Sequence, residues 1–165
     1  MRPPDDHVIA WRYWQVPPGP AVLRSVTQKH CTWSPGQRLT AICVGVGHDA
    51  PAEGCACGIY GSGDLGSLRD HGLCLAPDMA LVVGQVGLWG TVLPDGHGYR
   101  AQYAYPRELA LVQGSVGDDV ATVLTEGLGA YGVPVRTTTL HQAVGDVSAA
   151  VLAFQAMSAT TRARG

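Results

Sequence analysis

The hydrophobic and polar residues of the N-terminal part of the chain follow the pattern of short β-strands separated by turns. His7–Val16 is rich in valine, isoleucine, tryptophan and tyrosine, and aromatic residues fall on both of its alternating faces. We therefore predict a strand that is covered on both sides. Pro17–Pro20 ends this strand, Ala21–Thr27 is a second strand candidate, and Arg38–Val46 is a third that leads into a cysteine-rich segment.

The middle of the chain carries the clearest strand signals. Leu81–Leu93 is a long apolar run, residues 94–98 have turn chemistry, and Tyr99–Tyr105 alternates like a returning strand. This pattern predicts a β-hairpin. The glycines inside the first of these strands indicate a bend, a bulge or a close-packed neighbour. Before the hairpin, Asp64 is an N-cap candidate for a short helix over Leu65–Leu73.

The C-terminal third of the chain shows helical periodicity. Apolar residues at the spacing of one helix face predict a helix over Asp118–Ala130, and one of the two aspartates at its start is the expected N-cap. Gly132 fits the C-cap position, and Val133–Val135 is a candidate for a short edge strand. Asp146 is the expected cap of a second helix over Val147–Met157.

These elements predict an α+β fold for the 165 residues, organised as one domain over residues 1–165. Residues 8–113 are expected to form a small, twisted antiparallel sheet or a partly open barrel that carries a metal-binding loop. Two C-terminal helices would follow within residues 114–158. The chain shows no internal repeat and no linker that would divide it.

Composition and charge narrow the classes of protein. With 46% hydrophobic and 15% charged residues, the chain is too apolar for a disordered tail. A net charge of -2 and a pI of about 6.3 lack the basic footprint of a nucleic-acid-binding protein. No apolar run reaches the roughly 18 residues of a membrane span, and the N-terminus lacks the pattern of a signal peptide. We expect a cytoplasmic protein whose weakly charged surface suits a protein partner or another copy of itself.

Three of the five cysteines lie within fifteen residues, with a histidine between them, and this cluster carries the main chemical signal. Cys43, His48, Cys55 and Cys57 follow the spacing C-x4-H-x6-C-x-C. Three thiolates and one imidazole are a ligand set that tetrahedral zinc prefers, and a closed set of four ligands is typical of a structural site. The glycine, proline and alanine residues between them suit a loop that curls round an ion. The sequence therefore predicts a zinc site.

Other interpretations of the cysteines remain open. Buried free cysteine behaves as a small hydrophobe, so the thiols could be unligated. A disulfide is disfavoured in a reducing compartment, and a bridge between Cys55 and Cys57 would be strained. Cys31 or Cys74 would supply the fourth ligand if Cys43 pointed elsewhere. With three ligands bound, water would fill the fourth position and the site would be catalytic in type.

The joint order of the motifs resembles a group of uncharacterised small proteins that are common in high-GC actinobacteria. The family pattern places W-x-P-G, A-x-C, H-x-A-P, C-x-C-G-I-Y-A, V-x-L-W-G-x-V and A-x-P in that order. The matching segments are Trp33–Gly36, Ala41–Cys43, His48–Pro51, Cys55–Tyr60, Val83–Val92 and Ala104–Pro106. The match extends over Trp11–Pro106, about 60% of the chain, and Gly61 replaces the family's alanine. The resemblance implies that the cysteines and the histidine act together, and it implies no activity.

The remaining residues favour a binding protein over an enzyme, and no catalytic residue is assigned. The three glutamates are widely separated, and neither a nucleophile elbow nor a P-loop is present. The leading hypothesis is a zinc-stabilised small binding or adaptor domain, whose metal fixes a surface around Tyr60, Trp89 and Trp33. One alternative is a small-molecule-binding or self-resistance protein with an aromatic pocket. The other is an enzyme that uses an open metal position or a reactive cysteine.

Overall fold

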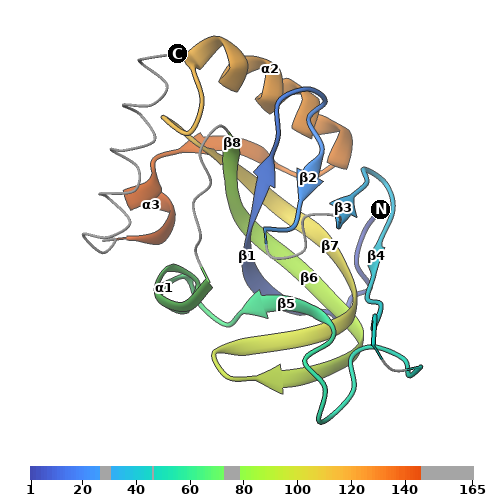
Figure 1. Ribbon diagram of the computed structural model, residues 1–165. Coiled ribbons are helices and arrows are strands. Elements are labelled where there is room, and N and C mark those ends of the chain that lie inside the picture. Colours follow the sequence, from blue (N-terminus) through green and yellow to red (C-terminus); the bar gives the residue numbers. More distant parts are fainter. Residues whose placement is uncertain (27–30, 46, 73–78, 146–165) are drawn as a thin grey trace.

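The computed structural model describes residues 1–26, 31–45, 47–72 and 79–145 (Figure 1). Its strands are β1 (Val8–Val16), β2 (Leu23–Arg24), β3 (Thr32–Trp33), β4 (Leu39–Thr40), β5 (Ile59–Ser62), β6 (Ala80–Asp95), β7 (Gly98–Val112) and β8 (Val135–Thr138). Its helices are α1 (Leu65–Ser67), the π-helical turn η1 (Leu68–Gly72), α2 (Asp118–Leu128), the 3-10 turn η2 (Gly129–Tyr131) and α3 (Leu140–Val144). The predicted α+β class is confirmed, with helices following the sheet in the C-terminal region.

All eight strands belong to one sheet, which is built round the predicted hairpin of β6 and β7 (Figure 1). The strand β1 pairs antiparallel with β6 along its whole length, whereas β8 pairs in parallel with β7, so the sheet is mixed. The short strand β5 pairs with β7 and also with β1, where Trp11 lies opposite Ser62. The order β1, β6, β7, β5 therefore returns to β1 through the single residue pair Trp11 and Ser62. The sheet is strongly curled but is not a clean barrel.

Glycines let the hairpin bend and pack tightly, as their pattern in the sequence predicts. The register of β6 against β7 shifts between Gln85 and Val86 and again between Trp89 and Val92. Gly90 lies at the second shift with a φ of +76°, a conformation that side chains disfavour. These two irregularities bend both long strands.

One edge of β7 is occupied in turn by β5, β4 and β8. The strand β4 ends opposite Tyr103, β5 begins opposite Ala101, and the amide of Ala41 donates to the carbonyl of Gln102 at 2.8 Å. Both short strands are antiparallel to β7, so they run in the same direction. They form a single edge strand that residues 42–58 interrupt. We call this insertion the metal loop; the structure describes all of it except residue 46.

Both faces of β1 are covered, as predicted. Ala10 and Trp14 lie in the larger cluster of buried hydrophobic residues, and Tyr13 lies in a second cluster against which Trp11 packs. Trp33 packs edge-on against Trp14, with ring centres 5.5 Å apart and planes at 84°. The aromatic residues thus supply much of the core volume.

Two buried tyrosines tie the helical segment to the short strands. The hydroxyl of Tyr131 accepts from the amide of Leu23 at 2.9 Å and donates to the carbonyl of Trp33. The hydroxyl of Tyr105 donates to the carbonyl of Tyr131 at 2.9 Å. Burial raises the pKa of Tyr131 to about 12 from its ordinary 10.0, because the charged phenolate is disfavoured in the core.

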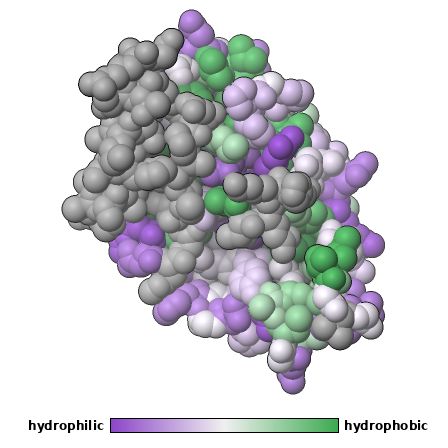
Figure 2. All heavy atoms as spheres, in the orientation of Figure 1, coloured by the Kyte–Doolittle hydropathy of each residue, from purple (hydrophilic) through white to green (hydrophobic). Residues whose placement is uncertain are grey.

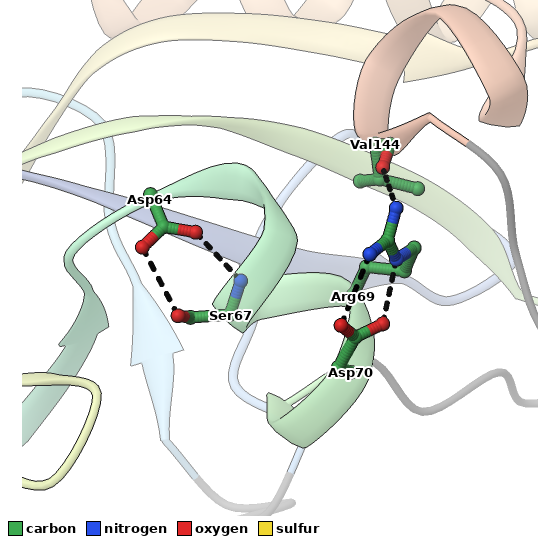
Figure 3. Close-up of polar contacts among 5 residues, drawn as sticks. All are labelled: Asp64, Ser67, Arg69, Asp70 and Val144. Carbon is green, nitrogen blue, oxygen red and sulfur yellow. Dashed lines mark hydrogen bonds and ion pairs between the residues drawn. The ribbon is translucent and has the colours of Figure 1, made fainter.

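The helical turn η1, which precedes β6 in the chain, contacts α3 through a hydrogen bond (Figure 3). Asp64 is the N-cap of α1, as predicted, and its Oδ1 accepts from the amide of Ser67 at 2.8 Å. Arg69 pairs with the neighbouring Asp70, with 2.6 Å between Nε and Oδ1, and its Nη1 donates to the carbonyl of Val144 at 3.4 Å. None of the helices in the described ranges has the length and apolar content needed to cross a bilayer.

Several predicted boundaries in the C-terminal part were wrong. The N-cap of α2 is Gly117, and the two aspartates lie in its first turn, where they face the positive end of the helix dipole. Gly132 has a φ of 67° and is confirmed as a C-cap, although of η2. The edge strand is β8, which begins at Val135 rather than ending there. The predicted helix Val147–Met157 lies outside the described residues.

The predicted strand Arg38–Val46 was wrong for most of its length. Of its described residues, those of β4 and the amide of Ala41 bond to β7. The chain leaves the edge of β7 after Ala41, so Cys43 lies in a loop rather than on a strand. The helix α3 was not predicted, although Thr139 and Gln142 form a capping box at its start.

Candidate metal centre

The metal loop brings the four predicted ligands together. One ligand atom each from Cys43, His48, Cys55 and Cys57 lies within 4.8 Å of all the others. The Sγ atoms of Cys43 and Cys55 are 3.8 Å apart, and Nε2 of His48 is 3.3 Å from Sγ of Cys57. A tetrahedral zinc with ordinary bond lengths would separate two sulfurs by about 3.8 Å and a sulfur from a nitrogen by about 3.6 Å. The four side chains are therefore positioned to hold a metal ion.

The chemistry of the donor set also fits a metal. Burial raises the pKa of the Cys57 thiol, and the neighbouring thiols of Cys55 and Cys43 raise it further, whereas a backbone hydrogen bond at Ala52 lowers it. Three thiols this close do not readily ionise together without a cation. A divalent ion removes this repulsion, and sulfur and imidazole donors select a borderline-soft ion such as zinc over calcium or magnesium.

Arg100 on β7 holds the backbone of the metal loop. Its side chain is 9% exposed, and its Nη1 donates to the carbonyl of Cys57 at 2.7 Å and to that of Cys55 at 2.5 Å. Its Nε lies 3.4 Å from a carboxylate oxygen of Asp95. A divalent ion with three thiolates has a net charge of about −1, so a buried guanidinium beside the ligands is electrostatically favourable.

Glycine is required where the loop returns to the sheet. Gly58 directly follows Cys57 and has a φ of +124°, which side chains rarely adopt. A Cβ at this position would lie 3.0 Å from the Cβ atoms of both Arg100 and Pro51. Pro51 itself follows a cis peptide bond. Gly58 therefore lets the backbone of Cys55 and Cys57 lie close to Arg100, which bonds to it.

Tyr60 on β5 supports the loop from the side of the sheet. Its hydroxyl donates to the carbonyl of Ala56, between the two ligands of C-x-C, at 2.7 Å. Burial raises the pKa of Tyr60, the carboxylate of Asp95 raises it further, and the charge of Arg100 opposes both. The neutral hydroxyl is thereby kept as a hydrogen-bond donor.

The other two cysteines have separate outcomes. Cys31 is a half-buried free thiol and does not belong to the cluster that contains Cys43. Cys74 lies outside the described residues. Cys43, which was predicted to lie on the third strand, supplies the fourth candidate ligand atom from a loop.

The residues predicted to form a contact surface are placed differently from one another. Tyr60 is 41% exposed, Trp89 is half-buried with its ring centre 6.0 Å from that of Tyr103, and Trp33 is only 2% exposed. The expectation that Trp33 lies at a contact surface was wrong, because its side chain fills the core against β1.

Two exposed apolar residues beside the cluster were missed. Ile42 and Val44 flank Cys43 and are 76% and 95% exposed. Figure 2 shows hydrophobic side chains at the surface where β4 leads into the metal loop. The sequence does show apolar residues on either side of Cys43, but this pattern was interpreted as part of a strand.

Comparison of the chain with protein-family models, with curated proteins and with solved structures finds no match in any of the three. The chemistry of the site is therefore inferred from its own residues. These residues form a group of four side chains on one loop that could hold a metal ion, and an arginine and a tyrosine from the sheet support the loop.

Proposed function

We propose that this protein is a zinc-stabilised binding domain. Cys43, His48, Cys55 and Cys57 hold a structural zinc ion, and the ion fixes the metal loop as a contact surface for a protein partner. The observation that carries this proposal is the approach of four suitable donor atoms to within 4.8 Å of one another. Four protein ligands fill a tetrahedral zinc, so no position remains for a substrate. A reducing cytoplasm would keep the three thiols available.

The exposed residues of the loop supply the contact surface. Ile42 and Val44, on either side of Cys43, are 76% and 95% exposed, and burial against a partner would remove this apolar surface from water. Tyr60 adds an aromatic ring with a polar tip from β5, a residue type that is enriched in protein interfaces. In this proposal the metal acts by ordering apolar side chains rather than by reacting.

Metal analysis and thiol counting test the metal part. Protein purified without chelator is expected to contain one zinc per chain, with its loop thiols protected from alkylation until a chelator is added. Cys43→Ser and Cys57→Ser should lose zinc stoichiometry, whereas Cys31→Ser, the matched control outside the cluster, should keep it. Native protein without stoichiometric zinc, and with all its loop thiols freely reactive, would overturn the proposal.

Site-specific crosslinking tests the contact surface. A photoreactive amino acid at position 44 should give a defined adduct with a cellular protein, and chelation of zinc or the change Ile42→Ser should abolish that adduct. The same probe at position 123 is the control, because Val123 is also exposed, at 67%, but lies on α2. Equal labelling from both positions, or labelling that does not depend on zinc, would contradict the assignment of the loop as the interface.

A further inference from the structure

Strand pairing and a ring contact place Cys31 and Arg12 on the same side of the sheet. Leu23 pairs with Trp33 in β2 and β3, and the amide of Ser25 continues this ladder by donating to the carbonyl of Cys31 at 3.0 Å (Figure 1). Since side chains alternate along a strand, Ser25 and Cys31 point to the side on which Trp33 is buried. The guanidinium of Arg12 reaches the same side, because its carbon lies 5.1 Å from the ring centre of Trp33.

A small cavity joins the two side chains. It has a volume of about 60 Å³, and Arg12, Ser25 and Cys31 line it together with residues of β4 and β5. A water molecule occupies about 30 Å³ of the liquid, so the cavity has room for a molecule of about two heavy atoms. The guanidinium is fixed between two lining residues, since one Nη donates to Oγ of Ser25 at 3.0 Å and the other donates to the carbonyl of Tyr60.

The cavity carries a positive charge that no described carboxylate balances. Among the described residues, no carboxylate lies within ion-pair distance of Arg12, and its Nε is buried without a hydrogen-bond partner. Burial lowers the pKa of Arg12 to about 10 from its ordinary 12.5, and the charge of Cys31 is the largest of those that oppose this shift. Reactive cysteines characteristically lie in electropositive and partly exposed surroundings, and the half-buried thiol of Cys31 meets both conditions.

We propose that Cys31 is a site of oxidation by hydrogen peroxide. The thiolate sulfur attacks one oxygen of the peroxide, a sulfur–oxygen bond forms as the oxygen–oxygen bond breaks, and the departing hydroxide takes a proton from solvent to become water. The sulfur is thereby oxidised to a sulfenic acid, and the peroxide is reduced. The guanidinium of Arg12 favours this step, because negative charge moves from the sulfur to the departing oxygen beside it. The proposal does not depend on the zinc-stabilised contact surface, since none of the four candidate metal ligands lines this cavity.

Experiments on the native protein test the site and its size. Treatment with one equivalent of hydrogen peroxide in the presence of dimedone, which traps sulfenic acids, should give an adduct on Cys31 that peptide mass spectrometry locates. In competition with glutathione at neutral pH, Cys31 should react at least about tenfold faster, because a neighbouring cation favours reaction of a thiolate. Cumene hydroperoxide is too large for the cavity, so the preference of Cys31 for hydrogen peroxide over this probe should exceed that of glutathione at least about tenfold.

Substitutions at position 12 test the role of the cation, and the experiments on the native protein do not depend on whether these variants fold. Arg12→Gln should lower the rate constant of Cys31 with hydrogen peroxide at least about tenfold, and Arg12→Lys should recover part of it. Arg38→Gln is the matched control and should keep the native rate constant, since Arg38 also lies over an aromatic ring, 4.0 Å from the centre of Tyr103, but does not line the cavity. The proposal is overturned if Cys31 carries no adduct, reacts no faster than glutathione, or shows no selectivity by size. A native rate constant in folded Arg12→Gln would also overturn it.

Discussion

Replacing Arg100 by methionine removes the side chain that holds the metal loop to β7. The guanidinium makes two short hydrogen bonds, to the carbonyls of Cys57 and Cys55, and a long one of 3.5 Å to the carbonyl of Ala52. A hydrogen bond from a charged donor contributes about 1.5–3 kcal/mol. The freed carbonyls belong to half-buried residues and can reach some water, so we use the lower value for the two short bonds and neglect the long one. The expected loss in free energy of unfolding is about 3 kcal/mol.

The same change should weaken metal binding. Groups that hold metal ligands from outside the coordination sphere typically change metal affinity by about 10- to 100-fold. Urea unfolding measured by circular dichroism gives the change in stability, and competition with a chromophoric chelator gives the zinc affinity. Arg100→Lys keeps the charge but not the planar fork of donors, so it should recover part of the zinc affinity and little of the backbone support.

Arg107→Met is the matched control for this experiment. Arg107 is another arginine of β7, and among the described residues its one hydrogen bond is a 3.4 Å contact from Nη1 to the side-chain oxygen of Gln85. Its removal should change the free energy of unfolding by less than about 0.5 kcal/mol and leave zinc affinity unchanged. If Arg100→Met and Arg107→Met gave the same stability and the same zinc affinity, Arg100 would have no role in positioning the loop.

Three further predictions follow from the structure. Because Gly58 has a positive φ, Gly58→Ala should lower the free energy of unfolding in urea by about 1–3 kcal/mol. Gly129 is the control, since it has a helical φ of −56° and no atoms near the position of a Cβ. Gly129→Ala should therefore be neutral or slightly stabilising. Because the pKa of the Tyr131 hydroxyl is raised to about 12 from 10.0, the unfolded chain loses this proton at a lower pH than the folded chain. The free energy of unfolding should therefore be constant below pH 10 and fall as the pH rises to 12. Chemical denaturation of Tyr131→Phe over this range should show a smaller fall. The exposed pair Ile42→Ser and Val44→Ser should shift the unfolding free energy by no more than about 0.5 kcal/mol; a larger loss in the same assay would mean that these side chains pack in the fold rather than await a partner.

The parts of the structure that depend on local chemistry were predictable from the sequence. The hairpin of β6 and β7 follows from a long apolar run, a turn and a returning strand, and the four ligands follow from donor type and close spacing. Asp64 and Gly132 were recognised as caps because capping needs only neighbouring residues.

The parts that depend on distant pairings were not predictable. Arg38–Val46 has the apolar content of a strand, but the edge of β7 accepts only its first residues before β5 takes the place beside them. The roles of Arg12 and Arg100 depend on the register of strands far apart in the chain, because each arginine bonds to the backbone of a distant segment. The sequence pattern does not show which aromatic side chains the rest of the fold will bury. For this reason Trp33 was predicted to lie at a contact surface.

The interrupted edge strand has a consequence for how the molecule can be altered. Because β4 and β5 lie in line along β7, joining Ala41 directly to Ile59 would give a continuous strand whose residues keep their present partners. The sheet thus carries residues 42–58 as an insertion that could be removed without changing the strand pairings. If the loop holds zinc as proposed, loss of the ion should loosen residues 42–58 while the sheet stays folded. A loop with other ligands or another recognition sequence could be grafted between Ala41 and Ile59.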